Sequence, residues 1–153
     1  IVSNEHLQLA LSTMLTLNKL GADFGKLSYV NAMTDVTGFG LLGHLCEMCE
    51  GSGLSAEIEF NKIPRFDFLD DYLQQKSVPG GTQRNWDSYG HKIGSLGDLQ
   101  RSVLADPQTS GGLLVSIDSR YKNEFEAQVK SKELQLESFG QLKRRGDKVI
   151  LVK

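Results

Sequence analysis

The sequence predicts an α+β domain in which a mixed β-sheet is covered by helices. Some short stretches are apolar at every second residue, as in half-buried strands, while longer stretches have apolar residues at helical spacing. The two patterns alternate along the chain, which is typical of a sheet with helices packed on it. With 153 residues, the chain is long enough for one domain with a hydrophobic core.

The first half of the chain contains three expected helices and two expected strands. Leucines recur at helical spacing from about residue 4 to residue 20, where Ser3 or Asn4 can cap the helix and Gly21 can end it. The pattern then predicts a strand over 27–36, a helix over 38–50, an alternating strand over 54–60 and a helix that starts at Pro64.

The second half begins with a long segment, residues 77–96, that has many glycines and little periodicity. Such a segment inside a compact domain is usually functional or disordered, and Trp86 and Tyr89 favour order here. After it we expect a helix over 98–104, a strand over 113–117, a helix from the cap Ser119 to about residue 130, and a closing hairpin of 137–142 with 148–152 that turns at 145–147.

Charge and hydropathy exclude several classes of function. The formal net charge is −2 and no basic stripe indicates nucleic-acid binding, since the cluster at 143–145 is interpreted as a solvated hairpin tip. No apolar run is long enough to span a bilayer and no signal-peptide pattern opens the chain, so a cytoplasmic location is expected. The chain starts at Ile1 without an initiator Met, which leads us to expect a domain of a longer protein.

The most informative motif joins an acidic residue to three glycines, where a strand is expected to pass into a helix (residues 34–44, TDVTGFGLLGH). Glycine has no Cβ, so the backbone at Gly38 and Gly40 can bring unpaired N–H groups close to a phosphate. Asp35 at the same junction can hold a hard cation beside that phosphate. The motif therefore predicts a phosphate and magnesium site with Asp35 as metal ligand. The alternative is that Asp35 caps the helix, although Thr37 lies closer to the helix start.

The same glycines permit two other interpretations. The pattern G-x-G-x-x-G from Gly38 to Gly43 matches the dinucleotide-binding fingerprint, and Glu57 or Glu59 lies near the spacing of a ribose-binding acid. That fingerprint needs an apolar strand that runs directly into the first glycine, whereas an aspartate and a threonine stand there. No Gly-Lys-Ser/Thr follows, so the motif is not a P-loop. The glycines can also simply permit tight packing of strand and helix.

Three residues in the following expected helix have side chains that can bind a ligand or a metal or take part in redox chemistry. His44 can face either a ligand or the core, and a structural role is favoured. Cys46 and Cys49 form a Cys-x-x-Cys pair, but they lie well inside the expected helix and no second cysteine pair completes a zinc site. We therefore interpret them as packed, reduced thiols.

Two further glycine-rich segments are found at residues 79–85 (PGGTQRN) and 106–112 (DPQTSGG). Both mix hydroxyl and amide side chains with glycine pairs, so they can donate hydrogen bonds to an oxyanion, or they can be tight turns with polar caps. Three such segments in one small domain favour an anion-binding function.

In this order, the segments 34–40, 79–85 and 106–114 resemble the C-terminal half of the selenophosphate synthetase (selenide, water dikinase) family, over essentially the whole chain. The first segment alone is shared with the wider superfamily of aminoimidazole-ribonucleotide synthetases. The resemblance implies the layered α/β fold of that superfamily's C-terminal domain, with residues 1–153 as one domain of a two-domain homodimer. It also implies a magnesium-dependent transferase that makes selenophosphate, AMP and orthophosphate from ATP, selenide and water, for selenocysteine biosynthesis.

The resemblance also assigns roles to residues. Asp35 matches the aspartate that this domain contributes to the magnesium and phosphate site, and Gly38, Gly40, Thr82 and Asn85 are expected to contact ATP. In the family, the reactive cysteine or selenocysteine belongs to the N-terminal domain, whose motifs this sequence lacks. We therefore expect no catalytic residue in this chain, an inactive isolated domain, and its own N-terminal domain as a partner.

Overall fold

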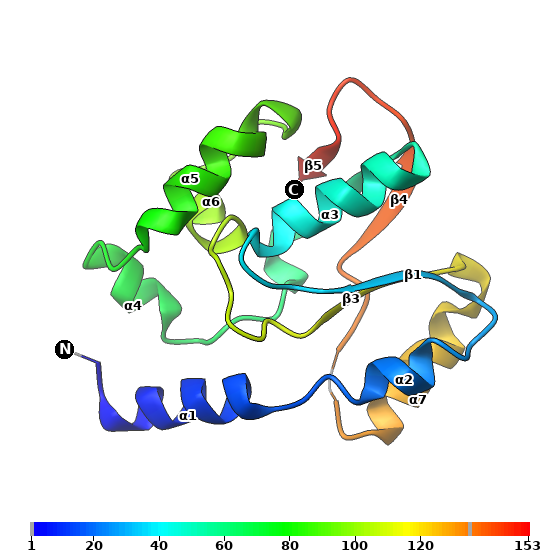
Figure 1. The fold of residues 1–153 in the computed structure, drawn as a ribbon, viewed down its shortest axis with the longest axis horizontal. Helices are drawn as coiled ribbons and strands as arrows, with labels where there is room; N and C mark the ends of the chain where they lie inside the picture. The colour runs from blue at the N-terminus through cyan, green and yellow to red at the C-terminus, as the bar shows by residue number, and fades with distance from the viewer. Residues whose placement is uncertain (1, 135) are drawn as a thin grey trace.

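In the computed structural model, which describes residues 2–134 and 136–153, the strands form two small sheets. In the first sheet, β1 (Val30–Asp35) pairs antiparallel with β3 (Leu113–Ile117). In the second, β2 (Leu54–Ile58) lies between an antiparallel β4 (Gly140–Arg144) and a parallel β5 (Ile150–Val152). Helices flank the strands (Figure 1), so the predicted α+β class is confirmed, with the strands divided between two sheets.

The α-helices of the described residues are α1 (Asn4–Leu15), α2 (Leu20–Phe24), α3 (Gly40–Ser52), α4 (Leu69–Gln74), α5 (Gly80–Tyr89), α6 (Asp98–Leu104) and α7 (Lys122–Ser131). Short 3-10 helices are η1 (Phe60–Lys62), η2 (Gly90–Lys92) and η3 (Ser119–Tyr121). The central helix is α3, which contacts strands of both sheets. It ends at Gly53, whose left-handed backbone lets its N–H bond to the last carbonyls of the helix.

The hydrophobic core surrounds α3. Leu42 of α3, Ile58 of β2 and Leu104 of α6 are each less than 2% exposed. Val36 and Leu114 belong to the same cluster and connect the first sheet to it. Burial of a side chain of this size contributes about 1.5–3 kcal/mol relative to leaving it exposed. This core fixes the end of β1 relative to α3 and α6.

The predicted closing hairpin is wrong. β4 and β5 run in opposite directions, but β2 lies between them and pairs with both. β2 buries most of its residues, whereas β4 is largely exposed. Because a buried strand needs hydrogen-bond partners for its backbone groups on both edges, β2 takes the central position and the two later strands flank it.

The first predicted helix is shorter than expected. It ends at Leu15, and Gly21 lies inside the separate helix α2 instead of ending the first one. The predicted start is confirmed, because the Ser3 hydroxyl accepts a hydrogen bond from the His6 N–H at 3.1 Å.

Two later helices begin at different residues from those predicted. α4 begins at Leu69 and not at Pro64. The segment that leads into α7 is capped by Asp118, whose side chain accepts from the Arg120 N–H, and not by Ser119. An aspartate directly before a serine offers the same kind of cap one residue earlier, which the sequence pattern does not distinguish.

The segment 77–96, expected to be irregular, contains α5 and η2. Pro79 occupies the N-cap of α5, and two glycines lie in its first turn. The start of this helix therefore has a composition that is typical of a loop. The buried residues of α5 are Thr82, Asn85 and Tyr89, all with polar groups. A helix with a polar buried face lacks the apolar periodicity by which helices are recognised in a sequence.

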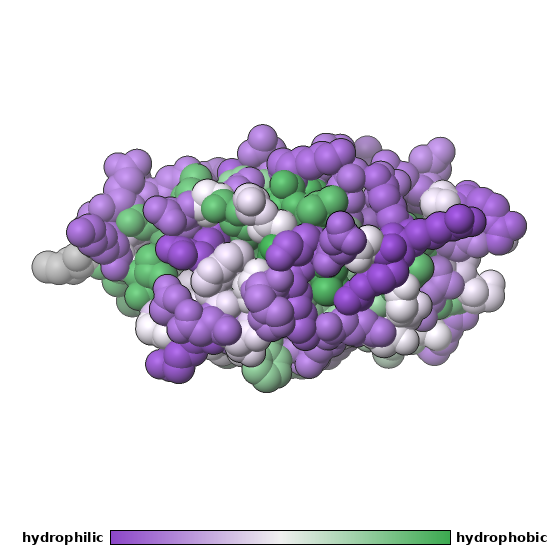
Figure 2. Space-filling model, turned by 90° about the horizontal axis from the view of Figure 1, so that it is seen from above, coloured by the Kyte–Doolittle hydropathy of each residue, from purple (hydrophilic) through white to green (hydrophobic). Residues whose placement is uncertain are grey.

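α1 lies along one side of the molecule (Figure 1) and buries none of its residues. The His6 ring stacks on Phe68 with ring centres 3.8 Å apart and its Nδ1 lies 2.9 Å from the Tyr72 hydroxyl, so α1 contacts the region of α4. The face shown in Figure 2 is mostly hydrophilic, with hydrophobic areas interrupted by polar side chains. Across the described residues, no helix has both the length and the apolar character needed to cross a membrane.

Candidate phosphate and metal site

Two of the three glycine-rich segments meet at one end of the first sheet. The antiparallel pairing places the end of β1 beside the start of β3, and hydrogen bonds continue beyond the strands. The Val36 N–H donates to the Gly112 carbonyl at 2.9 Å, and the Gln108 N–H donates to the Thr37 carbonyl at 3.0 Å. Residues 34–40 and 106–112 therefore lie side by side.

The third segment joins them through the buried face of α5. Thr82, Asn85 and Tyr89 share this face, because residues spaced i, i+3 and i+7 point in the same direction from a helix. The side-chain amide of Asn85 donates to the Gly38 carbonyl and to the Ala105 carbonyl, both at 2.9 Å. One side chain thus holds both loops.

Thr82 and Tyr89, at the two ends of the buried face of α5, also form hydrogen bonds with these two loops. The Thr82 hydroxyl donates to the Asp106 carboxylate at 3.2 Å, and the Gln108 amide donates to the other oxygen at 2.7 Å. Burial raises the pKa of Asp106 above its ordinary value, while these two hydrogen bonds oppose the rise. At the other end, the Tyr89 hydroxyl donates to the Phe39 carbonyl at 2.7 Å.

The two glycines assigned to the site have different surroundings. Gly40 has a φ of +68°, and a Cβ there would lie 2.8 Å from the Asp106 carbonyl oxygen. Only glycine permits both that backbone conformation and that approach, so Gly40 packs the two loops together. Gly38 is exposed, and a Cβ there would meet no atom within 4 Å. The packing interpretation is therefore supported for Gly40, and Gly38 lies on the open side of the loop.

Asp35 is the exposed last residue of β1. The N-cap of α3 is Phe39, so the alternative that Asp35 caps this helix is wrong. Its carboxylate makes no hydrogen bond or ion pair with the described residues, which leaves both oxygens open to a ligand. In the part of the chain that the structure describes, no three His, Cys, Asp or Glu side chains gather to hold a metal. Asp35 therefore offers a single carboxylate.

Thr37 and His44 form a pair beside the loop. The Thr37 hydroxyl lies 3.1 Å from His44 Nε2, so this hydroxyl does not cap α3. His44 is only 7% exposed, and its Nδ1 lies 3.3 Å from the Glu47 carboxylate without the alignment of a hydrogen bond. These contacts support the structural interpretation of His44, which fastens Thr37 to the first turns of α3.

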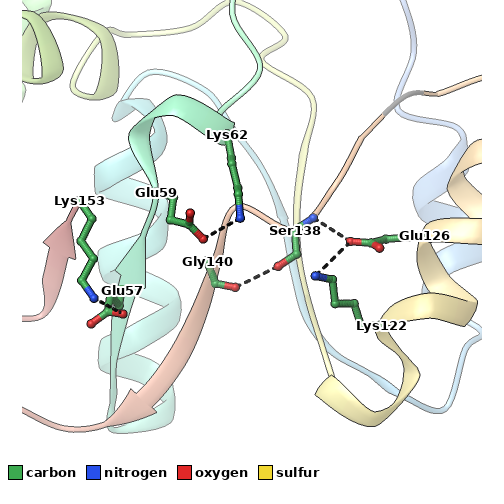
Figure 3. A network of polar contacts seen from close by, with 8 residues as sticks. All are labelled: Glu57, Glu59, Lys62, Lys122, Glu126, Ser138, Gly140 and Lys153. Atoms are coloured by element: carbon green, nitrogen blue, oxygen red, sulfur yellow. Dashed lines mark hydrogen bonds and ion pairs between the residues drawn. The ribbon is translucent and has the colours of Figure 1, made fainter.

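The acids that a dinucleotide site would need are already paired. Glu57 accepts from Lys143 and Lys153 at 2.9 Å each. Glu59 accepts from Lys62 at 2.9 Å, and Figure 3 shows this pair together with Glu57 and Lys153. A groove of about 880 Å³ lies between residues 61–70 and the region of α7, and none of the motif residues lines it. Neither feature extends the candidate site.

The structure brings the sequence-predicted residues into one region but changes what each contacts. Thr82 and Asn85 hold the loops through hydrogen bonds inside the protein, and their contact with ATP stays a prediction. Tyr89 was missed as a site residue, although its helical spacing from Thr82 and Asn85 is a signal that the sequence contains.

Several curated relatives are similar to nearly the whole chain. The selenide, water dikinase of Colwellia psychrerythraea is 53% identical over 138 residues, which cover 90% of this chain and 40% of that protein. That of Aeromonas hydrophila is 53% identical over 141 residues, with 92% and 41% covered. That of Photorhabdus laumondii is 47% identical over 148 residues, with 97% and 43% covered. The chain thus spans about two fifths of the length of these relatives.

Solved structures with a similar fold are thiamine-monophosphate kinases. The enzyme from Aquifex aeolicus has a TM-score of 0.52 and 17% identity, with 99% of this chain and 42% of that chain covered. The enzyme from Stenotrophomonas maltophilia has a TM-score of 0.50 and 15% identity, with 88% and 33% covered. At these identities the likeness shows the fold alone.

The family described as "AIR synthase related protein, C-terminal domain" matches residues 3–153. This match covers β1, the glycine-rich segments and the closing strands together. The chain therefore belongs to the AIR synthase related family and corresponds to its C-terminal domain.

Proposed function

We propose that this chain is the C-terminal domain of a selenide, water dikinase, which makes selenophosphate, AMP and orthophosphate from ATP, selenide and water. The observation that carries the proposal is the convergence of three motif segments at the open end of the first sheet, in a chain about half identical to enzymes of that name. The chain works together with the N-terminal region of such an enzyme, in a cytoplasmic homodimer.

Asp35 is the proposed magnesium ligand of this domain. Its carboxylate is exposed and has no partner among the described residues, which fits a cation that takes one or two carboxylates and completes its shell with phosphate oxygens and water. When bound, the metal neutralises charge on the phosphates during phosphoryl transfer. Asp35 supplies one ligand at a fixed place, because the antiparallel pairing of β1 with β3 places Asp35 opposite Leu113.

The loop after Asp35 is the proposed phosphate-facing segment for ATP. Gly38 lies on its open side, so the backbone there can approach a phosphate closely. Gly40, Thr82 and Asn85 support this loop from within, through close packing and hydrogen bonds. Positioning of this kind contributes most of the catalysis in phosphoryl transfer, where the protein does little covalent chemistry.

Phosphorus NMR of ATP turnover tests the proposed function. The sample is a joined protein, in which this chain is fused to the part of the Aeromonas hydrophila relative that this chain does not match. Turnover of ATP by the joined protein is followed with and without selenide. Selenide-dependent formation of selenophosphate, AMP and orthophosphate is the expected result. ATP consumption that is indifferent to selenide contradicts the substrate. A folded, magnesium-loaded protein without any turnover contradicts the activity as a whole.

The Asp35→Asn variant tests the metal ligand in the same joined protein. We expect turnover to fall by about a hundredfold, the order of loss when one electrostatic contact to the reacting charge is removed. The fold stays intact because Asp35 is exposed. Asp147→Asn, at an exposed turn, is the matched control. Near-normal turnover of Asp35→Asn at limiting magnesium would show that Asp35 is not a ligand.

A further inference from the structure

Two consecutive carbonyl groups of the loop after β1 accept hydrogen bonds from side chains of the same helix, α5. The Gly38 carbonyl accepts from Asn85 at 2.9 Å, and the Phe39 carbonyl accepts from the Tyr89 hydroxyl at 2.7 Å. Asn85 is 8% exposed and Tyr89 is 6% exposed, so both donors are buried, whereas Gly38 and Phe39 are exposed. Buried α5 donors thus determine how two neighbouring peptide groups are turned.

The orientation of the first peptide group follows from its planarity. In a trans peptide, the C=O of one residue and the N–H of the next point in opposite directions. Because the Gly38 carbonyl points to Asn85, the Phe39 N–H points away from α5. No acceptor among the described residues takes this N–H, while its neighbour Gly38 is exposed.

The second peptide group closes the turn by the same geometry. Since the Phe39 carbonyl points to Tyr89, the Gly40 N–H points in the opposite direction, where it donates to the Thr37 carbonyl at 3.0 Å. Tyr89 therefore stabilises the turn from 37 to 40, and Asn85 leaves one N–H of that turn available.

We propose that Asn85 and Tyr89 are positioning residues, which orient the peptide groups of Gly38–Phe39–Gly40 so that the Phe39 N–H faces a phosphate of the nucleotide. The inference rests on the proposed function for the identity of the phosphate, but the orientation of the loop can be tested without it. Neither side chain touches the substrate, and each acts through the backbone that it holds.

The contacts of Asn85 are specific to a planar amide. Its two N–H donors point to the carbonyls of Gly38 and Ala105, which belong to different loops. The same two loops also meet where Gly40 packs closely against the backbone of residues 104–106. An alanine in place of Asn85 would leave both carbonyls without a donor. Tyr89 also packs its ring beside Gly43, so a phenylalanine there keeps the packing and removes only the hydroxyl.

Residual dipolar couplings of backbone N–H groups measure this orientation in the isolated chain. We expect the Phe39 coupling to change in Asn85→Ala and the Gly40 coupling to change in Tyr89→Phe, because each peptide group loses its α5 donor. Ser88→Ala is the matched control, since Ser88 is an exposed residue of the same helix. Unchanged couplings at Phe39 and Gly40 in both folded variants would overturn the inference.

Kinetics of the joined protein measure the catalytic consequence. A misplaced donor affects the transferred phosphoryl group most in the transition state, so we expect Tyr89→Phe to lower kcat about tenfold and to change KM for ATP much less. Ile58→Val, a core substitution in the second sheet, controls for loss of stability alone and should keep kcat. Equal losses of kcat in these two variants would reduce Tyr89 to a structural role.

The two experiments separate the two proposals. If the joined protein shows no selenide-dependent turnover, the proposed function fails, while the dipolar couplings still decide whether Asn85 and Tyr89 orient the loop. If turnover is normal in Tyr89→Phe and the couplings are unchanged, the positioning role fails and the proposed function stands.

Discussion

Burial decides the chemistry of the two cysteines of α3. Cys46 is 3% exposed and Cys49 is 0% exposed, and both are free thiols. Burial raises the pKa of the Cys46 thiol to about 12 and that of the Cys49 thiol to about 11. Since the thiolate is the reactive form, the prediction of packed, reduced thiols is confirmed and a redox role is not supported.

We therefore predict that neither thiol reacts with a chromogenic disulfide reagent in the native chain near neutral pH. Both should react once the chain is unfolded in urea, which serves as the internal control. A pH dependence follows as well, because the unfolded thiols release their protons from about pH 9 while the native ones keep them to about pH 11 or 12. The free energy of unfolding should fall as pH rises through this range. Rapid labelling of the native chain would show that α3 opens or that the thiols are accessible.

At the residue scale, the sequence predicts where the candidate residues lie better than it predicts what they contact. Asp35 was predicted at the junction of a strand and a helix, and it is the exposed last residue of β1. Thr82 and Asn85 were selected because polar groups beside glycines can bind an anion, yet the same groups bind loop carbonyls and a carboxylate. A sequence shows that a donor is present, and only packing shows which acceptor it reaches.

At the scale of elements, Glu57 links the three strands of the second sheet. It lies on the central strand β2, and its carboxylate accepts from Lys143 of β4 and from Lys153 after β5. Both lysines are two residues beyond its directly paired neighbours, which is the diagonal position of cross-strand contacts. Hydrogen bonds from Lys153 and then Lys143 lower the pKa of Glu57 to about 2.

This arrangement predicts a pH-dependent effect of Glu57→Gln. A carboxyl group with a lowered native pKa stabilises the fold above its ordinary value of 4.5, and that contribution is lost as pH falls towards about 2. We expect Glu57→Gln to lower the urea midpoint of unfolding near neutral pH, and this difference from the original chain to shrink in acid. Glu133→Gln, at an exposed residue of the described chain, is the control. A difference that does not depend on pH would show that the lysines do not stabilise the native carboxylate.

The differences between the predicted and the observed elements share one cause. The helical period of α1 was recognised from leucines, yet α1 buries none of its residues. α5 was missed because the face that it buries is polar. β5 was paired with β4 because they are neighbours in the sequence, whereas the buried strand β2 separates them. Periodicity describes a segment alone, while burial depends on the segments that surround it.

At the scale of the whole molecule, apolar side chains on α1 are left without a cover in this chain. Leu7, Leu11 and Met14 are exposed, although they have the spacing that marks a helix in a folded domain. The matches to the curated relatives cover about two fifths of the length of those proteins. The periodicity of α1 therefore predicts a helix, and it does not show what packs on the exposed side of that helix.

The single exposed carboxylate of Asp35 sets the expected metal affinity of this chain. Mg²⁺ is usually bound by one or two carboxylates together with substrate phosphates, and the described residues offer no cluster beyond Asp35 at this site. We predict that the isolated chain binds Mg²⁺ only in the millimolar range or weaker, on the order of the weakest oxygen-ligand sites in proteins. Mn²⁺ titration, followed by paramagnetic broadening of backbone N–H signals, should affect Thr34 and Val36 first and should lose this preference in Asp35→Asn. Asp147→Asn should leave the broadening unchanged. Micromolar binding by the chain alone would mean that this domain holds a complete metal site, because a single exposed carboxylate in water does not bind a hydrated Mg²⁺ so tightly.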